Sequence, residues 1–212
     1  LSGVIAKLET MSKERLEAKS EFKQARRQAS RQQLSDRFAG RDSSLLPFDN
    51  IRTLLKQRNP LYRGVQQIPL DKIVGSVGRY REFNRSFLPL SDSLEPRWVN
   101  VHALASTQGW PPIEVYQIDD VYFVKDGNHR ASVARAMALP TIEAAVWEFP
   151  EEVDIGPEDT LDDVLIRFGE RAFMEQTHLD TLRPDHDIAF TTPGRYTELL
   201  TQIEDLQAKL SF

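Results

Sequence analysis

The sequence predicts an α+β fold with helical extensions at both ends, and three observations support this class. Short β-rich runs alternate with helical patterns between residues 60 and 150. Long stretches on either side have helical composition. The 212 residues, 40% of them apolar, are enough to bury a core. We therefore expect an N-terminal helical arm at 1–59, a central domain at 60–150 and an acidic helical extension at 151–212.

The N-terminal arm is expected to begin with a long helix from Ser12 to about Arg37, because this span contains neither Pro nor Gly. A break at Gly40–Ser44 and a short helix at Asp49–Arg58 follow. The apolar residues of the long helix form only a thin stripe, which predicts a surface helix or one that pairs with another helix. The stripe consists of Met11, Ala18, Phe22, Ala25 and Ala29.

The central domain is expected to contain strands, a hairpin and two helices. Pro69 interrupts the first strand, Gly109 closes the first helix, and Asp119-Asp120 forms the two-residue turn of the hairpin. The predicted elements are a strand at Val65–Val74, a helix at Arg97–Gln108, hairpin strands at Ile113–Ile118 and Val121–Lys125, a helix at about Ala131–Ala138, and a strand at Thr141–Phe149.

The C-terminal extension is expected to contain two amphipathic helices. The first spans Leu161 to about Gln176, and the second begins at Pro193 and ends near Leu210. Each carries an apolar half that predicts a packing face.

The net charge of −5 is unevenly distributed: residues 1–41 carry +5, residues 42–150 carry 0, and residues 151–212 carry −10. A basic head could bind nucleic acid by neutralising phosphates. It could equally dock on the acidic tail, within one chain or across a homodimer formed by the helical arms. The acidic tail repels nucleic acid, so docking is the preferred interpretation.

Several classes of function are excluded or disfavoured. The chain has no cysteine, so disulfides, thiolate metal sites and thiol catalysis are ruled out. No apolar run approaches the ~18 residues of a membrane span, and a charged N-terminus does not suit a secretion signal, so we expect a cytoplasmic protein. His178 and His186 stand near several Asp residues but lack helical ligand spacing, and no metal site is expected there.

The strongest candidate site is the polar box from Asp126 to Arg130, between a strand and a helix. Gly127 allows close backbone approach to a ligand, and Asn128 is expected to cap the helix, whose first N–H groups would face a bound phosphate. Arg130 could add a bidentate contact and His129 a further donor. Asp126 could position a magnesium-bound water or cap the turn. A purely structural turn is the alternative reading of the whole box.

Upstream of the box, three arginines follow Gly78 in one expected loop. Arg79, Arg81 and Arg85 could supply further phosphate contacts. A solvated face or a salt-bridged lid explains such a run equally well.

The span from about Ile68 to Phe149 resembles the ParB/sulfiredoxin superfamily, and in particular the ParB-like nuclease-domain proteins of bacteria and archaea. Its order of elements is a helix ending in Gly, a Pro-Pro-Ile-x-Val strand, a hairpin return, a Gly-containing polar box, a helix and a last strand. The resemblance therefore implies a ParB/sulfiredoxin-like core, and it covers about 80 of the 212 residues. The residues that carry it are Pro112–Tyr116, Val121–Lys125 and Asp126–Ala134.

The resemblance has different implications for each branch of the superfamily. In sulfiredoxin the box reads Gly-Gly-Cys-His-Arg, so Gly127, His129 and Arg130 match while Asn128 replaces the catalytic cysteine; sulfinic acid reduction is excluded. ParB proteins, with Gly-Glu-Arg-Arg, bind CTP and DNA, but no clear helix-turn-helix follows residue 150 here.

In the free serine kinases of this fold the box resembles Asp-Gly-His-Thr-Arg, which Asp126, Gly127 and Arg130 match. Those enzymes use a glutamate after the first strand as general base, and Glu82 occupies a broadly comparable place.

The common implication is binding of a nucleoside di- or triphosphate, such as ATP or CTP, with Mg²⁺ held largely by the phosphates. The chain would then be an NTPase or small-molecule kinase. The alternative is a nucleotide-switched transcriptional regulator or DNA-partition module without its own catalysis, so enzymatic activity stays open. The catalytic candidates are Glu82 and Asp126, and the nucleotide-binding candidates are Gly127, Asn128, His129, Arg130, Arg79 and Arg81.

Overall fold

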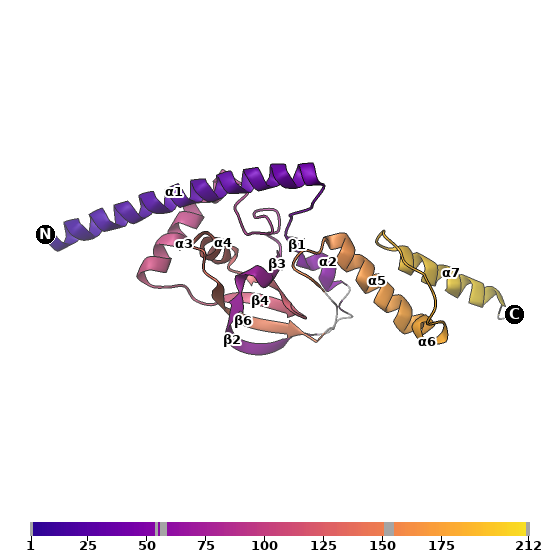
Figure 1. Ribbon diagram of the computed structural model, residues 1–212. Helices are drawn as coiled ribbons and strands as arrows, with labels where there is room; N and C mark the ends of the chain where they lie inside the picture. The colour runs from indigo at the N-terminus through magenta and orange to yellow at the C-terminus, as the bar shows by residue number, and fades with distance from the viewer. Residues whose placement is uncertain (1, 54, 56–58, 151–154, 211–212) are drawn as a thin grey trace.

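The computed structural model describes residues 2–53, 55, 59–150 and 155–210. A mixed sheet lies at the centre, a long N-terminal helix crosses above it, and the C-terminal helices extend from one side (Figure 1). Two short 3-10 helices, at Leu70–Lys72 and Asp92–Leu94, connect the larger elements. Those elements are α1 (Ser2–Ala39), β1 (Leu46–Pro47), α2 (Phe48–Arg52), β2 (Leu61–Pro69), β3 (Ile73–Ser76), α3 (Glu95–Thr107), β4 (Ile113–Ile118), β5 (Val121–Asp126), α4 (Asn128–Ala136), β6 (Thr141–Phe149), α5 (Leu161–Thr177), α6 (Leu179–Leu182) and α7 (Arg195–Leu210).

The strand order of the sheet is β1-β3-β5-β4-β6-β2. Strands β1, β3 and β5 run parallel, whereas β4 is antiparallel to β5 and parallel to β6. Strand β2 closes the far edge by antiparallel pairing with β6, from Leu61 opposite Glu148 to Pro69 opposite Thr141. The carboxyl ends of β3 and β5 therefore meet at one edge of the sheet, where α4 begins.

Both faces of the sheet are covered, because successive residues of a strand point to opposite faces. In β5, Val124 belongs to the core shared with α1, α3 and α4, whereas Phe123 belongs to the core shared with α2 and α5. In β3, Ile73 and Val74 divide in the same way. The sheet is thus the central layer of a helix–sheet–helix arrangement.

The long N-terminal helix is confirmed and extends beyond its predicted limits, to Ser2–Ala39. The helix pairs with α3, which is one of the two arrangements that its thin apolar stripe predicted. Phe22 is 1% exposed and packs edge-on against Trp98, with 5.6 Å between ring centroids. The small residues of the stripe let α1 approach the central domain closely, and Ala18, Ala25 and Ala29 are all buried. The side chain of Met11 is outside the described residues.

The interruption predicted at Pro69 in the strand Val65–Val74 is confirmed, whereas the continuation of one strand beyond it is wrong. The segment forms two strands, β2 and β3, which a 3-10 turn separates after Pro69. The two-residue strand β1 had no predictive pattern. The predicted helix at Asp49–Arg58 is observed as Phe48–Arg52, and residues 54 and 56–58 are outside the described residues.

The other predicted elements agree with the structure within a few residues, and the α+β class with N- and C-terminal helices is confirmed. The hairpin of β4 and β5 turns at Asp119-Asp120, and Gly109 follows α3 with φ of 72°. The division at residues 59 and 150 stays a prediction. Over the described residues, no helix combines the length and apolar character that crossing a membrane requires.

Candidate functional site

The turn between β5 and α4 requires glycine at position 127. Gly127 has φ of 110°, in the left-handed region, and a Cβ there would lie 2.5 Å from Cγ2 of Ile113. The first N–H in the ladder of α4 is that of Ala131, which donates to the Gly127 carbonyl at 3.0 Å. The N–H groups of residues 128–130 have no intrahelical acceptor and face outward from the helix start, the arrangement that binds anions.

Asn128 is not the cap that the sequence predicted. The N-cap is Gly127, without a side-chain cap bond, and Asn128 is the first residue of the helix. Its side chain is buried and its Oδ1 accepts from the Ser76 hydroxyl at 2.8 Å. Asn128 therefore ties the end of β3 to the start of α4, so that its carbonyl oxygen is used within the fold.

The Arg130 side chain turns inward and binds the chain itself. Its Nη1 donates to the carbonyls of Pro111 and Pro112 at 2.7 and 2.8 Å, and its Nη2 pairs with the Asp126 carboxylate. Only 14% of the Arg130 side chain is exposed, against 62% for Asp126. In this structure the pair holds the segment before β4 against the start of α4, which is a positioning role.

His129 is the unusual residue of the box. It is 4% exposed, its ring meets Phe83 edge-on at 5.3 Å, and neither ring nitrogen has a hydrogen-bond partner among the described residues. Burial, followed by the charge of Arg97, lowers the pKa of His129 to about 4, with Arg79 acting in the same direction and Glu82 against it. At neutral pH the imidazole is uncharged, and it presents one unused donor and one unused acceptor.

Glu82 and Arg79 form an ion pair beside the box. Nη1 of Arg79 donates to both carboxylate oxygens of Glu82, at 2.8 and 2.9 Å. The expected general base is thus held by the neighbouring cation, and both charges act on His129. The structure therefore brings together Glu82, Arg79 and the box, which sequence spacing alone did not place.

Arg97 belongs to the same site and was missed from the sequence. It lies in the first turn of α3, is exposed, and has no ion-pair partner in the part of the chain that the structure describes. A cation in the first turn opposes the helix dipole, which favours negative charge there. That unfavourable placement is the signal that could have identified Arg97, since a nearby anion would offset it.

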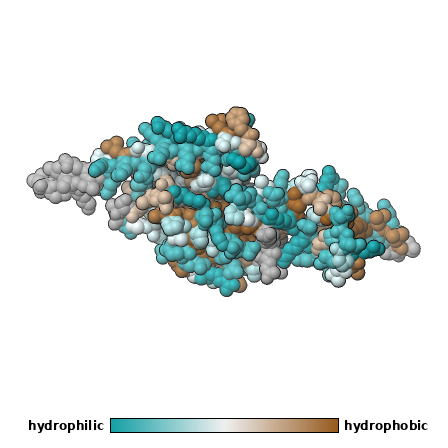
Figure 2. All heavy atoms as spheres, viewed as in Figure 1, coloured by the Kyte–Doolittle hydropathy of each residue, from teal (hydrophilic) through white to brown (hydrophobic). Residues whose placement is uncertain are grey.

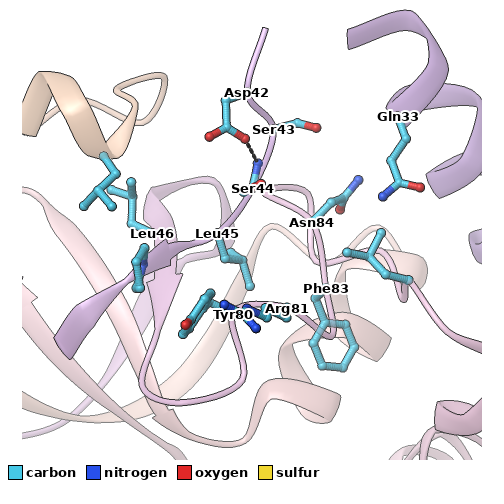
Figure 3. A pocket seen from close by; sticks show the side chains of 13 residues that line it. Gln33, Asp42, Ser43, Ser44, Leu45, Leu46, Tyr80, Arg81, Phe83 and Asn84 are labelled. Atoms are coloured by element: carbon cyan, nitrogen blue, oxygen red, sulfur yellow. Dashed lines mark hydrogen bonds between the residues drawn. The ribbon is translucent and has the colours of Figure 1, made fainter. Parts of the chain in front are cut away.

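Arg81 occupies a neighbouring cavity. Its guanidinium lies over the Tyr80 ring at 5.5 Å, and both residues line a hollow of about 400 Å³ between the end of α1 and the loop after β3 (Figure 3). Leu45 and Phe83 line the same hollow. Phe83 is therefore a shared wall, because its ring also contacts His129. No residue of the Asp126–Arg130 box lines the hollow itself.

Arg85 does not face this site. Its guanidinium donates to the carbonyls of Ser44, Pro157 and Asp159, at 3.0, 3.1 and 2.8 Å. These bonds fasten the segment before α5 to the central domain. The phosphate contact considered for Arg85 is thus replaced by a structural role.

The donor set does not fit a Mg²⁺ ion held by the protein. The two carboxylates of the site, on Glu82 and Asp126, are each paired with an arginine. Within the described ranges, no group of three or more His, Cys, Asp or Glu side chains is placed to hold a metal, the region of His178 and His186 included. A Mg²⁺ ion at this site would have to arrive on the phosphates of its ligand.

Comparisons with known proteins add little to what the geometry shows. No protein-family model matches the sequence, and no curated protein matches it. Among solved structures, the crystal structure of sulfiredoxin from Arabidopsis thaliana is similar, with 24% sequence identity, coverage of 39% of this chain and 82% of that chain, and a TM-score of 0.30. A similarity at this level supports no argument about function, and the resemblance to ParB-like nuclease-domain proteins stays a prediction.

Proposed function

We propose that the chain binds a nucleotide through its phosphates at the start of α4. The observation that carries the proposal is the buried His129 ring, neither nitrogen of which has a partner in the described part of the chain, and which lies beside the N–H groups of 128–130. A buried polar group without a partner costs about 1–3 kcal/mol, so a ligand that satisfies it gains that amount. Arg97 supplies an unpaired positive charge at the same place.

The hollow beside Phe83 supports a nucleotide over inorganic phosphate. Its volume of about 400 Å³ falls within the range of small-molecule sites, and it offers aromatic and apolar surface with polar groups at its rim. A ligand with its phosphates at His129 would extend past Phe83 to place its base and sugar near Tyr80 and Arg81. The hollow thus suits the uncharged part of the ligand, and the helix start suits the charged part.

Glu82 gives the site a route to phosphoryl transfer. A phosphate that takes over Arg79 would separate it from Glu82, whose carboxylate could then accept a proton from the attacking hydroxyl or water. Arg97, the helix start and any Mg²⁺ bound to the phosphates would neutralise charge on the transferred group. Binding and activation of the base would therefore be the same event.

Titration calorimetry with ATP, CTP, GTP, UTP, ADP and orthophosphate, each with Mg²⁺, tests the binding proposal. We expect one of the nucleotides to bind more tightly than orthophosphate. Arg97→Ala should weaken it roughly 10- to 100-fold, because a charge-assisted contact contributes about 1.5–3 kcal/mol. Arg52→Ala, an exposed change on α2, is the matched control and should bind as the wild type does. Absence of binding by every nucleotide, or equal binding by Arg97→Ala, contradicts the proposal.

Phosphate release by Glu82→Gln tests the catalytic step separately. The substitution should keep nucleotide affinity and lower the rate about 100-fold or more, as removal of a general base does. If the nucleotide binds but wild type and variant release phosphate equally slowly, the chain is a nucleotide-binding module and the catalytic step is wrong.

A further inference from the structure

Helix α1 has an outer face that no described part of its own chain covers. The buried residues Ala18, Phe22, Ala25 and Ala29 define the inner line of the helix. Residues spaced by three or four positions share a face, and one such series lies directly opposite that line. We call this series the outer stripe of α1. It comprises Lys13, Leu16, Ser20, Lys23, Arg27, Arg31, Leu34 and Phe38, and every member is exposed.

The outer stripe combines unpaired positive charge with exposed apolar side chains. Leu16, Leu34 and Phe38 are 67%, 58% and 91% exposed. No acidic residue belongs to the stripe, and its four cations have no ion pair to the described residues, whereas cations flanking it do: Arg26 pairs with Asp92 at 3.0 Å. Figure 2 shows the hydrophilic surface over α1 with an apolar projection at its C-terminal end. Exposed large apolar residues on a charged helix are typical of a surface that contacts a partner.

The C-terminal helices carry the complementary chemistry. Helices α5 and α7 pack through Phe173 and Tyr196, with 5.6 Å between ring centroids. Beyond that contact the apolar side of α7 continues into solvent, where Leu206 and Leu210 are 57% and 82% exposed. Carboxylates accompany these leucines on α7, including the exposed Glu204 and Asp205, and residues 151–212 together carry −10.

Leu182, at the end of α6, is another exposed apolar side chain among carboxylates. It is 71% exposed and is preceded by Asp180 and followed by Asp185, both exposed. The unit of α5–α7 therefore offers apolar side chains among anions, whereas the outer stripe offers apolar side chains among cations.

Over the residues that the structure describes, the two surfaces do not meet within one chain. Among the described residues no ion pair joins α1 to the segment 155–210, and Figure 1 shows α7 extending away from the sheet on the side opposite the start of α1. Docking of the basic head on the acidic tail of the same chain, one of the two sequence-based options, is thus not observed.

We propose that the outer stripe of α1 in one copy binds the α5–α7 unit of a second copy. If each copy uses both surfaces, two identical contacts close a twofold dimer. Opposite charge fixes the orientation of the partners, and Leu16, Leu34 and Phe38 pack against the exposed leucines of the unit. This proposal does not depend on nucleotide binding.

Sedimentation of the full chain tests the dimer. In about 0.05 M salt we expect a mass twice that of one chain, and in about 1 M salt the mass of one chain, because the Debye length falls to about 3 Å. The double variant Arg27→Glu/Arg31→Glu should be monomeric in both. The control Arg52→Glu/Lys72→Glu makes the same change in net charge away from the stripe and should remain dimeric. A monomeric wild type, or a dimeric Arg27→Glu/Arg31→Glu variant, overturns the proposal.

A charge exchange identifies the occupant of the stripe. Glu204→Lys/Asp205→Lys should also be monomeric by itself. Mixed with Arg27→Glu/Arg31→Glu it should form a heterodimer, since both contacts in the mixed pair are again complementary. Failure of the two variants to associate contradicts the α1–α7 contact. Binding of duplex DNA by a monomeric wild type, lost in Arg27→Glu/Arg31→Glu, would instead assign the stripe to nucleic acid and overturn the proposal.

Discussion

At the residue scale, the His129 side chain gives the protein a definite pH dependence. Its pKa is about 4 in the folded chain and about 6.5 in an unfolded one. Between these values the unfolded state binds the extra proton, so the free energy of unfolding rises with pH across this window and is lost as pH falls. From pH 7 to pH 5 the loss attributable to His129 is about 2 kcal/mol.

Urea unfolding of the wild type and of His129→Phe at both pH values measures this loss. The phenylalanine ring fills similar space and does not titrate. The free energy of unfolding of His129→Phe should therefore fall between pH 7 and pH 5 by about 2 kcal/mol less than that of the wild type. The comparison subtracts the background from all other groups. An identical pH dependence in the two proteins would show that His129 titrates normally. In wild type, a bound nucleotide should raise the His129 pKa, which the imidazole resonances report by NMR.

The identity of the candidate site could be predicted from the sequence, whereas the directions of its side chains could not. Gly127 before a helix predicts an anion-facing turn because local backbone geometry decides it. Arg130 points inward because the carbonyls of Pro111 and Pro112, which are 19 and 18 positions away, come within its reach only after β4 has paired with β5. Arg97 and His129 come together through the packing of α3 on α4, which a local pattern does not encode.

At the element scale, Phe22 is the largest buried side chain among the described residues of α1. Phe22→Ala should lower the free energy of unfolding by about 3–5 kcal/mol, because it removes a ring that is 1% exposed and leaves a cavity beside Trp98. Gln28→Ala, an exposed change on the same helix outside the outer stripe, is the control and should change stability by less than about 0.5 kcal/mol. Chemical denaturation measures both. Equal effects would mean that α1 does not depend on this contact.

Residues 65–74 show why a β-rich composition did not predict that this segment belongs to two separate strands. Its β-rich composition is real, but Pro69 lacks the N–H that would continue the ladder, and the next residue, Leu70, donates instead to the Pro140 carbonyl at 3.1 Å. The chain then turns and enters the sheet as β3, with the three strands β6, β4 and β5 between it and β2. Composition predicts strand propensity, whereas distant partners decide which strand a residue joins. The thin stripe of α1 was similarly ambiguous until its partner α3 was in place.

At the scale of the whole molecule, Arg85 connects the central domain to the C-terminal helices. The sequence placed it among phosphate-binding candidates, because neither of its distant acceptors, the carbonyls of Pro157 and Asp159, has a sequence signature. Its three carbonyl contacts require the planar, five-donor guanidinium.

We expect Arg85→Lys to loosen this connection, because an ammonium group of shorter reach cannot satisfy three separate carbonyls. Hydrogen exchange at the N-terminal end of α5 should accelerate roughly 10-fold or more, for the loss of at least one charge-assisted bond of about 1.5–3 kcal/mol. Exchange in β4 and β5 should not change. Arg63→Lys makes the same substitution at an arginine that pairs with Glu148; it is the control and should leave α5 as protected as in the wild type.

The pairing of β2 with β6 has a consequence for how the protein is made. Leu61 in β2 lies opposite Glu148 in β6. The neighbour of β2 in the sheet is β6, so β2 leaves the ribosome early but can pair only after β6 has been synthesised. During that interval β2 has both edges open, and assembly is slowed by the entropy of closing so long a loop. The charged Arg63, the irregular register between Tyr62 and Val65 and the terminal Pro69 are features that discourage such a waiting strand from pairing with another nascent chain.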